Sequence, residues 1–153
     1  MKFFKKIKHI HFVGIGGAGM IGFAKVLNQK GYVISGSDIT DSDDIQKLKK
    51  DGAKIFIGHS RNNIKGADLL VFSSAIDKVN PELVEAKRQS ITTIPRAEML
   101  GSLMIGYESI AVAGSHGKTT TTSMIAKILS NSNLSPTYII GGKVLSTDLN
   151  SDL

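Results

Sequence analysis

Residues 7–19 read IKHIHFVGIGGAG, and this stretch decides the fold. Its first seven residues, Ile7–Val13, carry the apolar and aromatic content of a strand, and glycines follow directly. Three of those glycines match Gly-x-Gly-x-x-Gly, in which they permit a tight turn, close approach of the backbone to a pyrophosphate, and close packing of helix on strand. A helix is expected next, over Ala18–Gln29. The stretch therefore predicts a strand–loop–helix unit that binds a nucleotide.

Strands and helices continue to alternate along the chain. The further strands that we expect are Tyr32–Gly36, Lys54–Ile57, Leu69–Phe72, Thr92–Ile94, Ile110–Ala113 and Thr137–Ile140. The further helices that we expect are Ser42–Lys50, Pro81–Gln89 with Asn80 as its cap, Arg96–Met104 and Lys118–Leu129. This alternation predicts an α/β fold with a parallel sheet and helices on both faces. We expect a Rossmann-like domain over residues 1–106 and an incomplete phosphate-loop (P-loop) domain over residues 107–153.

A second glycine-containing loop lies at residues 111–122, which read AVAGSHGKTTTT. In a phosphate loop the backbone N–H groups and the helix start bind an anion, a lysine reaches the β- and γ-phosphates, and a threonine hydroxyl holds Mg²⁺. Lys118 and Thr119 have these places here. The spacing is short, because Val112 stands where the usual first glycine would be and Gly114 is the nearest glycine. The loop predicts use of ATP or GTP; the alternative is a plain strand–turn–helix junction.

An acidic residue follows the second expected strand. Asp38 stands where a Rossmann acid meets a ribose hydroxyl, and the first loop with Asp38 alone would indicate an NAD(P)-binding oxidoreductase domain. A structural turn without a ligand is the other alternative. The second loop would then be unexplained. A protein that joins a nucleotide-linked substrate to another molecule with ATP needs both loops.

Composition narrows the class of protein. The 153 residues have 19 Lys and Arg against 13 Asp and Glu, a formal net charge of +6, and no cysteine. Thiolate metal sites and disulfides are therefore excluded. Nucleic-acid binding is not expected, because no aromatic platform accompanies the lysines near the N-terminus. No apolar run approaches the length of a membrane span and no secretory signal is recognisable, so we expect a cytoplasmic protein without membrane attachment.

Several segments together resemble the Mur ligases. The segments that carry the resemblance are His11–Met20, Gly36–Asp38, Ser73–Ile76, Asn80–Glu82, Arg96–Leu100 and Ala113–Thr121. The resemblance covers essentially the whole chain and accounts for the short spacing of the second loop. Ser115 departs from the pattern, since threonine is usual there, but the hydroxyl is kept.

The resemblance implies an ATP- and Mg²⁺-dependent ligase of peptidoglycan precursor synthesis. It is nearest to the members that join L-alanine to the carboxylate of UDP-N-acetylmuramate through an acyl phosphate. Members that attach a preformed peptide to the same sugar nucleotide are the alternative within the family. A UDP-sugar-binding module without catalysis is a third possibility. The family has three domains, and its Mg²⁺-binding glutamate and histidine have no counterpart here. We therefore expect the front part of a longer protein, inactive alone.

The resemblance also implies roles for individual residues. The ATP loop comprises Gly114, Ser115, His116, Gly117, Lys118, Thr119 and Thr120. Within it Lys118 is the catalytic residue and Thr119 is the Mg²⁺ ligand. The UDP-sugar contacts are Gly16, Gly17, Ala18, Gly19, Met20, Asp38, Ser73, Ser74, Ala75 and Arg96.

Three assignments among these and the histidines have alternatives. Arg96 either grips phosphate in a bidentate manner or pairs with Glu98 on the surface. Met20 is either a core residue or a neighbour of the diphosphate. His9, His11 and His59 have no partners at metal-ligand spacing, so we interpret them as structural. For His59 the alternative is a contact with uridine.

Overall fold

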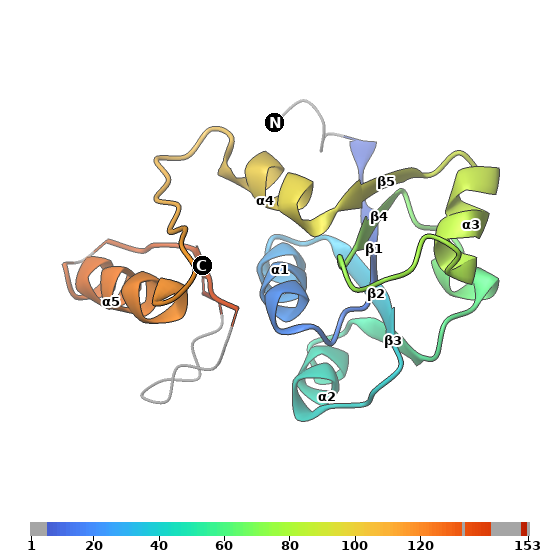
Figure 1. The fold of residues 1–153 in the computed structure, drawn as a ribbon, viewed down its shortest axis with the longest axis horizontal. Helices are drawn as coiled ribbons and strands as arrows, with labels where there is room; N and C mark the ends of the chain where they lie inside the picture. The colour runs from blue at the N-terminus through green and yellow to red at the C-terminus, as the bar shows by residue number, and fades with distance from the viewer. Residues whose placement is uncertain (1–5, 133, 142–150, 153) are drawn as a thin grey trace.

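The main sheet has five parallel strands. The computed structural model describes residues 6–132, 134–141 and 151–152, and the strand order is β3-β2-β1-β4-β5 (Figure 1). These strands are β1 (His9–Val13), β2 (Val33–Asp38), β3 (Lys54–Ile57), β4 (Leu69–Phe72) and β5 (Thr92–Pro95). This order is that of a Rossmann sheet, whose topological switch point lies between β1 and β4. The predicted Rossmann-like parallel sheet is confirmed.

Helices cover both faces of the sheet. They are α1 (Ala18–Gln29), α2 (Asp43–Lys50), α3 (Pro81–Arg88) and α4 (Arg96–Met104), with a short 3₁₀ helix η2 (Arg61–Ile64) before β4. Buried side chains of α1, α2 and α4 form one core with the strands, and those of η2 and α3 form a smaller core. Figure 1 shows α1 and α2 on the opposite side of the sheet from α3. Among the described residues, no helix has the length and apolarity needed to cross a bilayer.

The helix boundaries follow from local chemistry. The Ser42 hydroxyl accepts a hydrogen bond from the Ile45 N–H at the start of α2, and the Asn80 side chain accepts one from the Glu82 N–H at the start of α3. Pro81 occupies the first turn of α3, where a missing N–H costs nothing. Both predicted starts are correct to within a residue.

One predicted strand is absent. Residues 110–113 are not in a strand, and Ile110 is 64% exposed. Beyond α4 the described part of the chain holds only α5 (Lys118–Asn131) and a two-residue strand β6 (Tyr138–Ile139), antiparallel to β7 (Ser151–Asp152). A strand needs a neighbour to satisfy its N–H and C=O groups, and residues 110–113 have none within the described ranges. The prediction of a strand there is wrong for this reason.

Gly36 allows the turn after β1 to lie directly against β2. A Cβ built on Gly36 would stand 2.6 Å from Ile15 Cδ1 and 2.8 Å from the Phe12 carbonyl oxygen. The N–H groups of Gly14 and Ile15 both donate to the Ser37 carbonyl oxygen, at 2.9 and 3.0 Å. Any side chain on β2 at this position would displace the glycine loop.

A buried polar network crosses the sheet from β1 to α3. Glu82, fully buried, accepts hydrogen bonds from Ser37 Oγ (2.5 Å), Asn63 Nδ2 (2.6 Å) and the Ser60 N–H (3.2 Å), and lies 3.4 Å from His11 Nε2. Burial alone would raise the pKa of Glu82, but the hydrogen bonds from His11, Ser37 and Asn63 outweigh burial and lower it. The carboxylate thereby ties the residues after β3 to α3.

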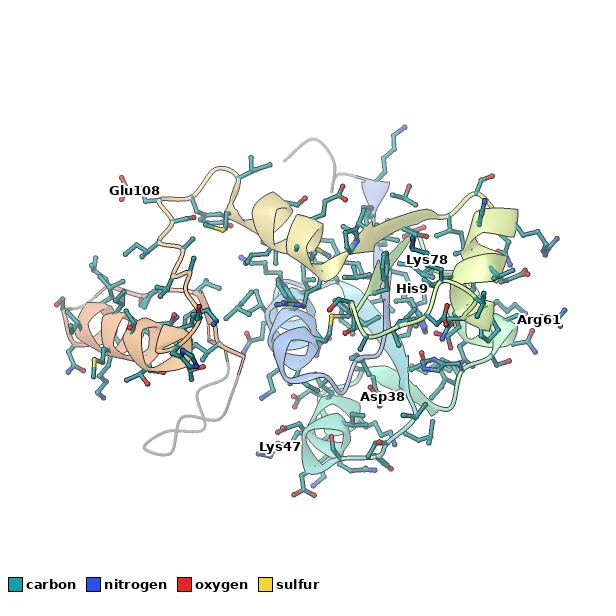
Figure 2. All side chains as sticks on the ribbon, in the orientation of Figure 1. His9, Asp38, Lys47, Arg61, Lys78 and Glu108 are labelled. Atoms are coloured by element: carbon teal, nitrogen blue, oxygen red, sulfur yellow. The ribbon has the colours of Figure 1, made fainter. Side chains whose placement is uncertain are left out.

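Figure 2 shows where His9, whose ring joins this network through Ser35, lies in the fold. His9 lies among the strands of the sheet, whereas Lys47 on α2 and Arg61 on η2 project outward. The ring of His9 contacts the Gly66 carbonyl oxygen and Ser35 Oγ, and the ring of His11 contacts the same hydroxyl. These contacts agree with a structural role for both histidines.

The Gly36→Ala substitution should destabilise the fold by about 1–3 kcal/mol, because the new methyl group must force apart backbone and packed side chains. Urea unfolding measures the change. Gly101→Ala is the matched control, since nothing lies within 4 Å of a Cβ built on this glycine of α4 and alanine favours a helix. Equal losses for the two variants would contradict the close-approach argument.

Acid should destabilise the protein through Glu82. Its folded pKa lies below the unfolded value of 4.5, so its contribution is present above pH 4.5 and is lost as the pH falls through the folded pKa. The wild type should therefore lose unfolding free energy between pH 5 and about pH 3 as the Glu82 carboxylate gains its proton. Urea unfolding measures this loss, and the carboxyl carbon signal of Glu82 in NMR reports the proton. An unfolding free energy that stays constant while Glu82 becomes protonated would contradict the prediction.

Candidate functional site

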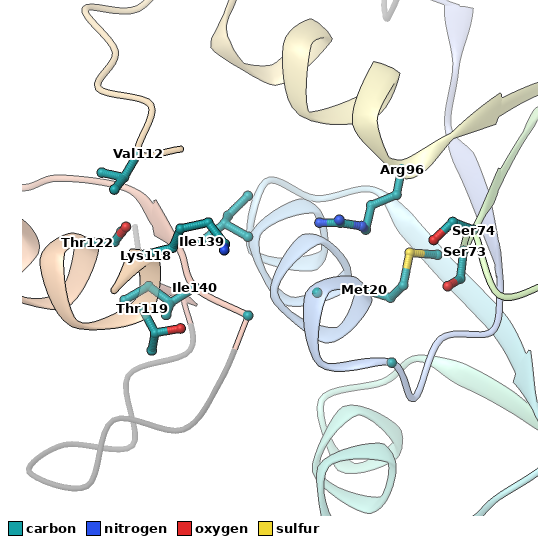
Figure 3. Close-up of a pocket in the computed structure, with 13 residues that line it drawn as sticks. Met20, Ser73, Ser74, Arg96, Val112, Lys118, Thr119, Thr122, Ile139 and Ile140 are labelled. Carbon is teal, nitrogen blue, oxygen red and sulfur yellow. The ribbon is translucent and has the colours of Figure 1, made fainter. Parts of the chain in front are cut away.

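The two sequence motifs meet at one cavity of about 490 Å³ (Figure 3). One wall comes from the first domain: Gly17, Gly19, Met20, Ser73, Ser74 and Arg96. The other wall comes from the second segment: Val112, Lys118, Thr119, Thr122, Ile139, Ile140 and Gly141. The structure therefore gathers residues from both ends of the chain around a single space.

The start of α1 contributes Gly17, Gly19 and Met20 to the first wall. Its N-cap is Gly17, no side chain caps the helix, and no acidic residue occupies its first turn. Uncapped N–H groups and the positive end of the helix dipole make such a start a site for anions. Met20 lines the cavity although it is only 1% exposed, so its side chain serves both the core and the cavity wall.

Arg96 stands directly beside the start of α1. A Cβ built on Gly19 would lie 2.9 Å from an Arg96 guanidinium nitrogen, so a side chain there would push the guanidinium away from the helix start. Arg96 is exposed, and within the described part of the chain it forms no ion pair with Glu98 or any other carboxylate. The surface ion pair with Glu98 is therefore not found, and the guanidinium is available to an anion in the cavity.

The start of α5 forms the second wall. Gly117 is its N-cap in a left-handed conformation (φ +77°), again with no side-chain cap and no acidic residue in the first turn. Gly114 also has positive φ (+140°), so glycine is needed at both turns of the loop. Lys118 Nζ donates to the carbonyl oxygens of Gly114 and Ser115, the latter at 3.0 Å. Figure 3 shows Arg96 and Lys118 on opposite sides of the cavity.

Asp38 lies next to the glycine loop and outside the cavity. Its Oδ2 accepts a hydrogen bond from the Gly16 N–H at 2.8 Å, and its Oδ1 accepts one from the Thr40 N–H at 3.1 Å. A carboxylate bound in this way holds the loop that forms the cavity floor. Asp38 and Gly16 thus stabilise the conformation of the glycine loop without lining the cavity.

The remaining predicted site residues divide between the two walls and their surroundings. Ala75 is exposed, and its N–H donates to Ser73 Oγ, so it supports the loop after β4 without lining the cavity. The exposed residues Gly114, Ser115, His116, Gly117 and Thr120 belong to the second loop but do not line the cavity. Ala18 opens α1. His59 donates or accepts through Nδ1 with Ser37 Oγ at 3.0 Å, outside the cavity.

Sequence reasoning missed several residues of the region. Val112, Thr122 and residues 139–141 line the cavity but were given no binding role, because their position depends on how the second segment packs against the first. Glu82 was also missed. A glutamate after Asn80-Pro81 is an ordinary first-turn residue, and its burial follows only from the contacts of α3 with the strands. The available signal was the pair His9 and His11, which stand two residues apart on one predicted strand and need polar partners if they are buried.

Thr119 has the lining hydroxyl that lies in the first turn of α5, where the sequence analysis expects a ligand of Mg²⁺. The Thr119 side chain lines the cavity, and no group of three or more His, Cys, Asp or Glu residues able to hold a metal occurs within residues 6–132, 134–141 and 151–152. Mg²⁺ is commonly held by one or two protein oxygens together with phosphate oxygens and water. The residues present therefore fit a partial site that a phosphate ligand would complete.

Known proteins similar to this chain agree in their description. UDP-N-acetylmuramate–L-alanine ligase of Sulfurihydrogenibium sp. (strain YO3AOP1) is 52% identical over 97% of this chain and 33% of its own length. The enzyme of that name from Aquifex aeolicus (strain VF5) is 53% identical over 97% of this chain and 33% of its own length. The chain thus spans about a third of the curated relatives that it matches.

Solved structures support the same relationship. The crystal structure of UDP-N-acetylmuramate-alanine ligase from Thermotoga maritima matches with a TM-score of 0.88 and 35% identity, over 94% of this chain and 34% of that one. The UDP-N-acetylmuramate:L-alanyl-gamma-D-glutamyl-meso-diaminopimelate ligase from Neisseria meningitides matches with a TM-score of 0.85 and 29% identity, over 96% of this chain and 47% of that one.

Two family models match consecutive parts of the chain. The model described as "Mur ligase family, catalytic domain" matches residues 9–108, and the model described as "Mur ligase middle domain" matches residues 112–152. The predicted resemblance is therefore correct, and the chain belongs to the Mur ligase family.

Proposed function

We propose that this chain provides the UDP-sugar-binding part and the first ATP-binding elements of a ligase that joins L-alanine to the carboxylate of UDP-N-acetylmuramate. The observation that carries the proposal is the single cavity between the start of α1 and the start of α5, with Arg96 on one side and Lys118 on the other. The names of the relatives support this choice of substrates. We assign residues 1–106 to the UDP-sugar domain and residues 107–153 to the ATP domain.

The first wall suits a diphosphate. The N–H groups at the start of α1 and the Arg96 guanidinium provide fixed donors and positive charge, and the hydroxyls of Ser73 and Ser74 add further donors. We assign the UDP contact to this wall, with Ala18 at the helix start. Gly16, Asp38 and Ala75 are assigned to supporting positions around it.

The second wall suits the phosphates of ATP. We assign the ATP contact to the loop Gly114–Thr120, with the Thr119 hydroxyl as one ligand of Mg²⁺, which would neutralise phosphate charge. Lys118 has a flexible four-carbon side chain, so it can leave its own loop carbonyls and turn toward a phosphate across the cavity. Phosphoryl transfer depends mostly on positioning and charge neutralisation, and Lys118 provides both.

The proposed reaction has two steps. The muramoyl carboxylate oxygen attacks the γ-phosphorus of ATP, which releases ADP and leaves an acyl phosphate. The amine of L-alanine then attacks the acyl carbon, the amide bond forms as the nitrogen loses one proton, and inorganic phosphate leaves with the bonding electron pair and takes up that proton. Lys118 offsets the negative charge on the transferred group in both steps, because that group stays beside the start of α5. We propose a cytoplasmic location for this ligase, as its resemblance to the Mur ligases implies.

A ligase that attaches a peptide instead of L-alanine is the second candidate. The Neisseria structure matches almost the whole chain, so the fold and the UDP-sugar wall are compatible with either amine. Among the solved structures the alanine ligase is 35% identical and the peptide ligase 29%, and the curated relatives at 52–53% are alanine ligases, which favours L-alanine.

The purified chain should bind UDP-N-acetylmuramate and not NADH. Isothermal titration calorimetry with each compound at equal concentration measures this directly. The cavity extends from the glycine loop to Lys118, which suits a UDP-sugar beside ATP. Asp38 accepts a hydrogen bond from the Gly16 N–H and does not line the cavity, so it is not placed to bind the ribose of NADH there. Heat from NADH with none from the UDP-sugar would refute the ligase proposal and support an oxidoreductase domain.

Alanine substitutions should separate the two walls. Arg96→Ala should weaken binding of UDP-N-acetylmuramate about 10–100-fold, the loss of a charge-assisted hydrogen bond, while leaving ATP affinity nearly unchanged. Lys118→Ala should do the reverse. Arg88→Ala on α3 is the control, because this arginine pairs with Glu85 and does not line the cavity. If Arg96→Ala and Arg88→Ala bind the UDP-sugar equally well, Arg96 has no part in the site.

A further inference from the structure

The buried network of His9, Ser35, His11 and Glu82 lies outside the proposed ligand cavity and has no part in the proposed reaction. His9 and His11 are on β1, Ser35 is on β2, and Glu82 is in the first turn of α3. His11, Ser35 and Glu82 are at most 2% exposed. Water therefore does not solvate the protons among His11, Ser35 and Glu82, and the hydrogen bonds among these residues fix where those protons are.

The four members form a continuous chain of four contacts. His9 Nδ1 lies 2.8 Å from the Gly66 carbonyl oxygen, and His9 Nε2 lies 2.7 Å from Ser35 Oγ. His11 Nδ1 lies 2.7 Å from the same Ser35 Oγ, and His11 Nε2 lies 3.4 Å from Glu82 Oε2. Each contact needs one proton between its two atoms, because otherwise two lone pairs would face each other.

Counting the protons gives a deficit of one. Two neutral imidazoles supply one proton each and the Ser35 hydroxyl supplies one, a total of three for four contacts. The Gly66 carbonyl oxygen only accepts, so His9 Nδ1 is protonated. Ser35 has a single proton, so one of the two imidazole nitrogens that face it must donate. The fourth proton resides on a histidine or on Glu82.

The surroundings of Glu82 place the fourth proton on a histidine. Its two oxygens accept from the Ser37 hydroxyl, the Asn63 amide and the Ser60 N–H, and an ionised carboxylate accepts all of these. The same bonds lower the pKa of Glu82 despite its burial, which raises it. A protonated carboxyl would have to give up part of this set of donors.

We propose that His9 and His11, bridged by Ser35, share one proton more than two neutral imidazoles hold, so that the buried set with the Glu82 carboxylate has no net charge. Two arrangements satisfy the four contacts. In one, His11 is the imidazolium and the Ser35 hydroxyl donates to His9. In the other, His9 is the imidazolium and the Ser35 hydroxyl donates to His11. The first arrangement becomes the second when His11 Nδ1 gives its proton to Ser35 Oγ and the Ser35 hydroxyl gives its own proton to His9 Nε2. Ser35 therefore acts as a proton relay between a fully buried and a partly exposed histidine.

Other charged groups border this relay. Asp68 Oδ2 accepts from the backbone N–H groups of Lys8 and His9, which puts a carboxylate near the His9 end. At the other end the ring of His11 packs at 6.5 Å from the ring of Phe56, and Lys54 Nζ lies over that ring at 5.2 Å. Negative charge at both ends, from Asp68 and from Glu82, favours retention of the shared proton.

The charge on Glu82 also orients His59. The Ser37 hydroxyl has a single proton, which it donates to Glu82, so Ser37 Oγ accepts from His59 Nδ1–H. Neutral His59 is thereby held as the Nδ1–H tautomer with Nε2 as an acceptor. Glu82 is thus a positioning residue for His59.

Nitrogen NMR of the histidine side chains tests the proposal on the unmodified chain at neutral pH. Long-range proton–nitrogen spectra distinguish the imidazolium from the two neutral tautomers. The expected result is one imidazolium charge distributed over His9 and His11, and the Nδ1–H tautomer for His59. Two neutral imidazoles at positions 9 and 11, or a protonated Glu82 in the carboxyl carbon spectrum, would overturn the proposal.

Two substitutions on the same helix provide a second test. Glu82→Gln removes the charge that the shared proton balances, so both imidazoles should become neutral and His59 should lose its fixed tautomer. Glu85→Gln is the matched control, since Glu85 pairs with Arg88 on the surface of α3 and should leave the histidine spectra unchanged. A charged imidazole that persists in a folded Glu82→Gln protein would contradict the coupling. If that variant does not fold, the spectra of the unmodified chain decide the question alone.

Discussion

The close packing of the glycine loop against β2 is the constraint on which the site depends. The loop turns over Gly36, receives the Asp38 carboxylate on the Gly16 N–H, and donates two N–H groups to the Ser37 carbonyl oxygen. These contacts fix the place at which α1 begins. Gly17, Gly19 and Met20 at this start line the cavity, and Arg96 lies close to Gly19.

The cavity has an electrostatic character that neither wall has alone. Two helix starts without caps face it, and each bears the partial positive charge of its dipole. Arg96 and Lys118 add a full charge on each side. Bringing four sources of positive potential together costs energy unless anions enter the space. The arrangement thus suits a ligand pair with several phosphates, as a nucleotide sugar and ATP would provide.

Much of the first domain could be predicted from the sequence because its signals are local. The bounds of α1 were exact, and the caps Ser42 and Asn80 gave the starts of α2 and α3. The strand predicted at residues 110–113 failed because its apolar character was local but its pairing partner was not. Apolar residues predict that a segment can pair, and they do not supply the neighbouring strand.

The site residues likewise divide into those recognisable from local sequence and those that depend on packing between distant segments. The glycine loops, Arg96 and Lys118 were recognisable from motifs whose chemistry is contained in a few consecutive residues. That they face one another was not recognisable, because it depends on packing between segments about a hundred residues apart in the printed sequence. Glu82 was hidden for a related reason, since its partners come from β1, β2 and the residues after β3.

Lys118 stabilises the loop that precedes its own helix. Its ammonium group donates to the carbonyl oxygens of Gly114 and Ser115. Any anion that binds this ammonium group must replace the two carbonyl oxygens as its hydrogen-bond acceptors. Such binding is an exchange of partners, so its net change in free energy is smaller than the strength of the new contact alone would indicate.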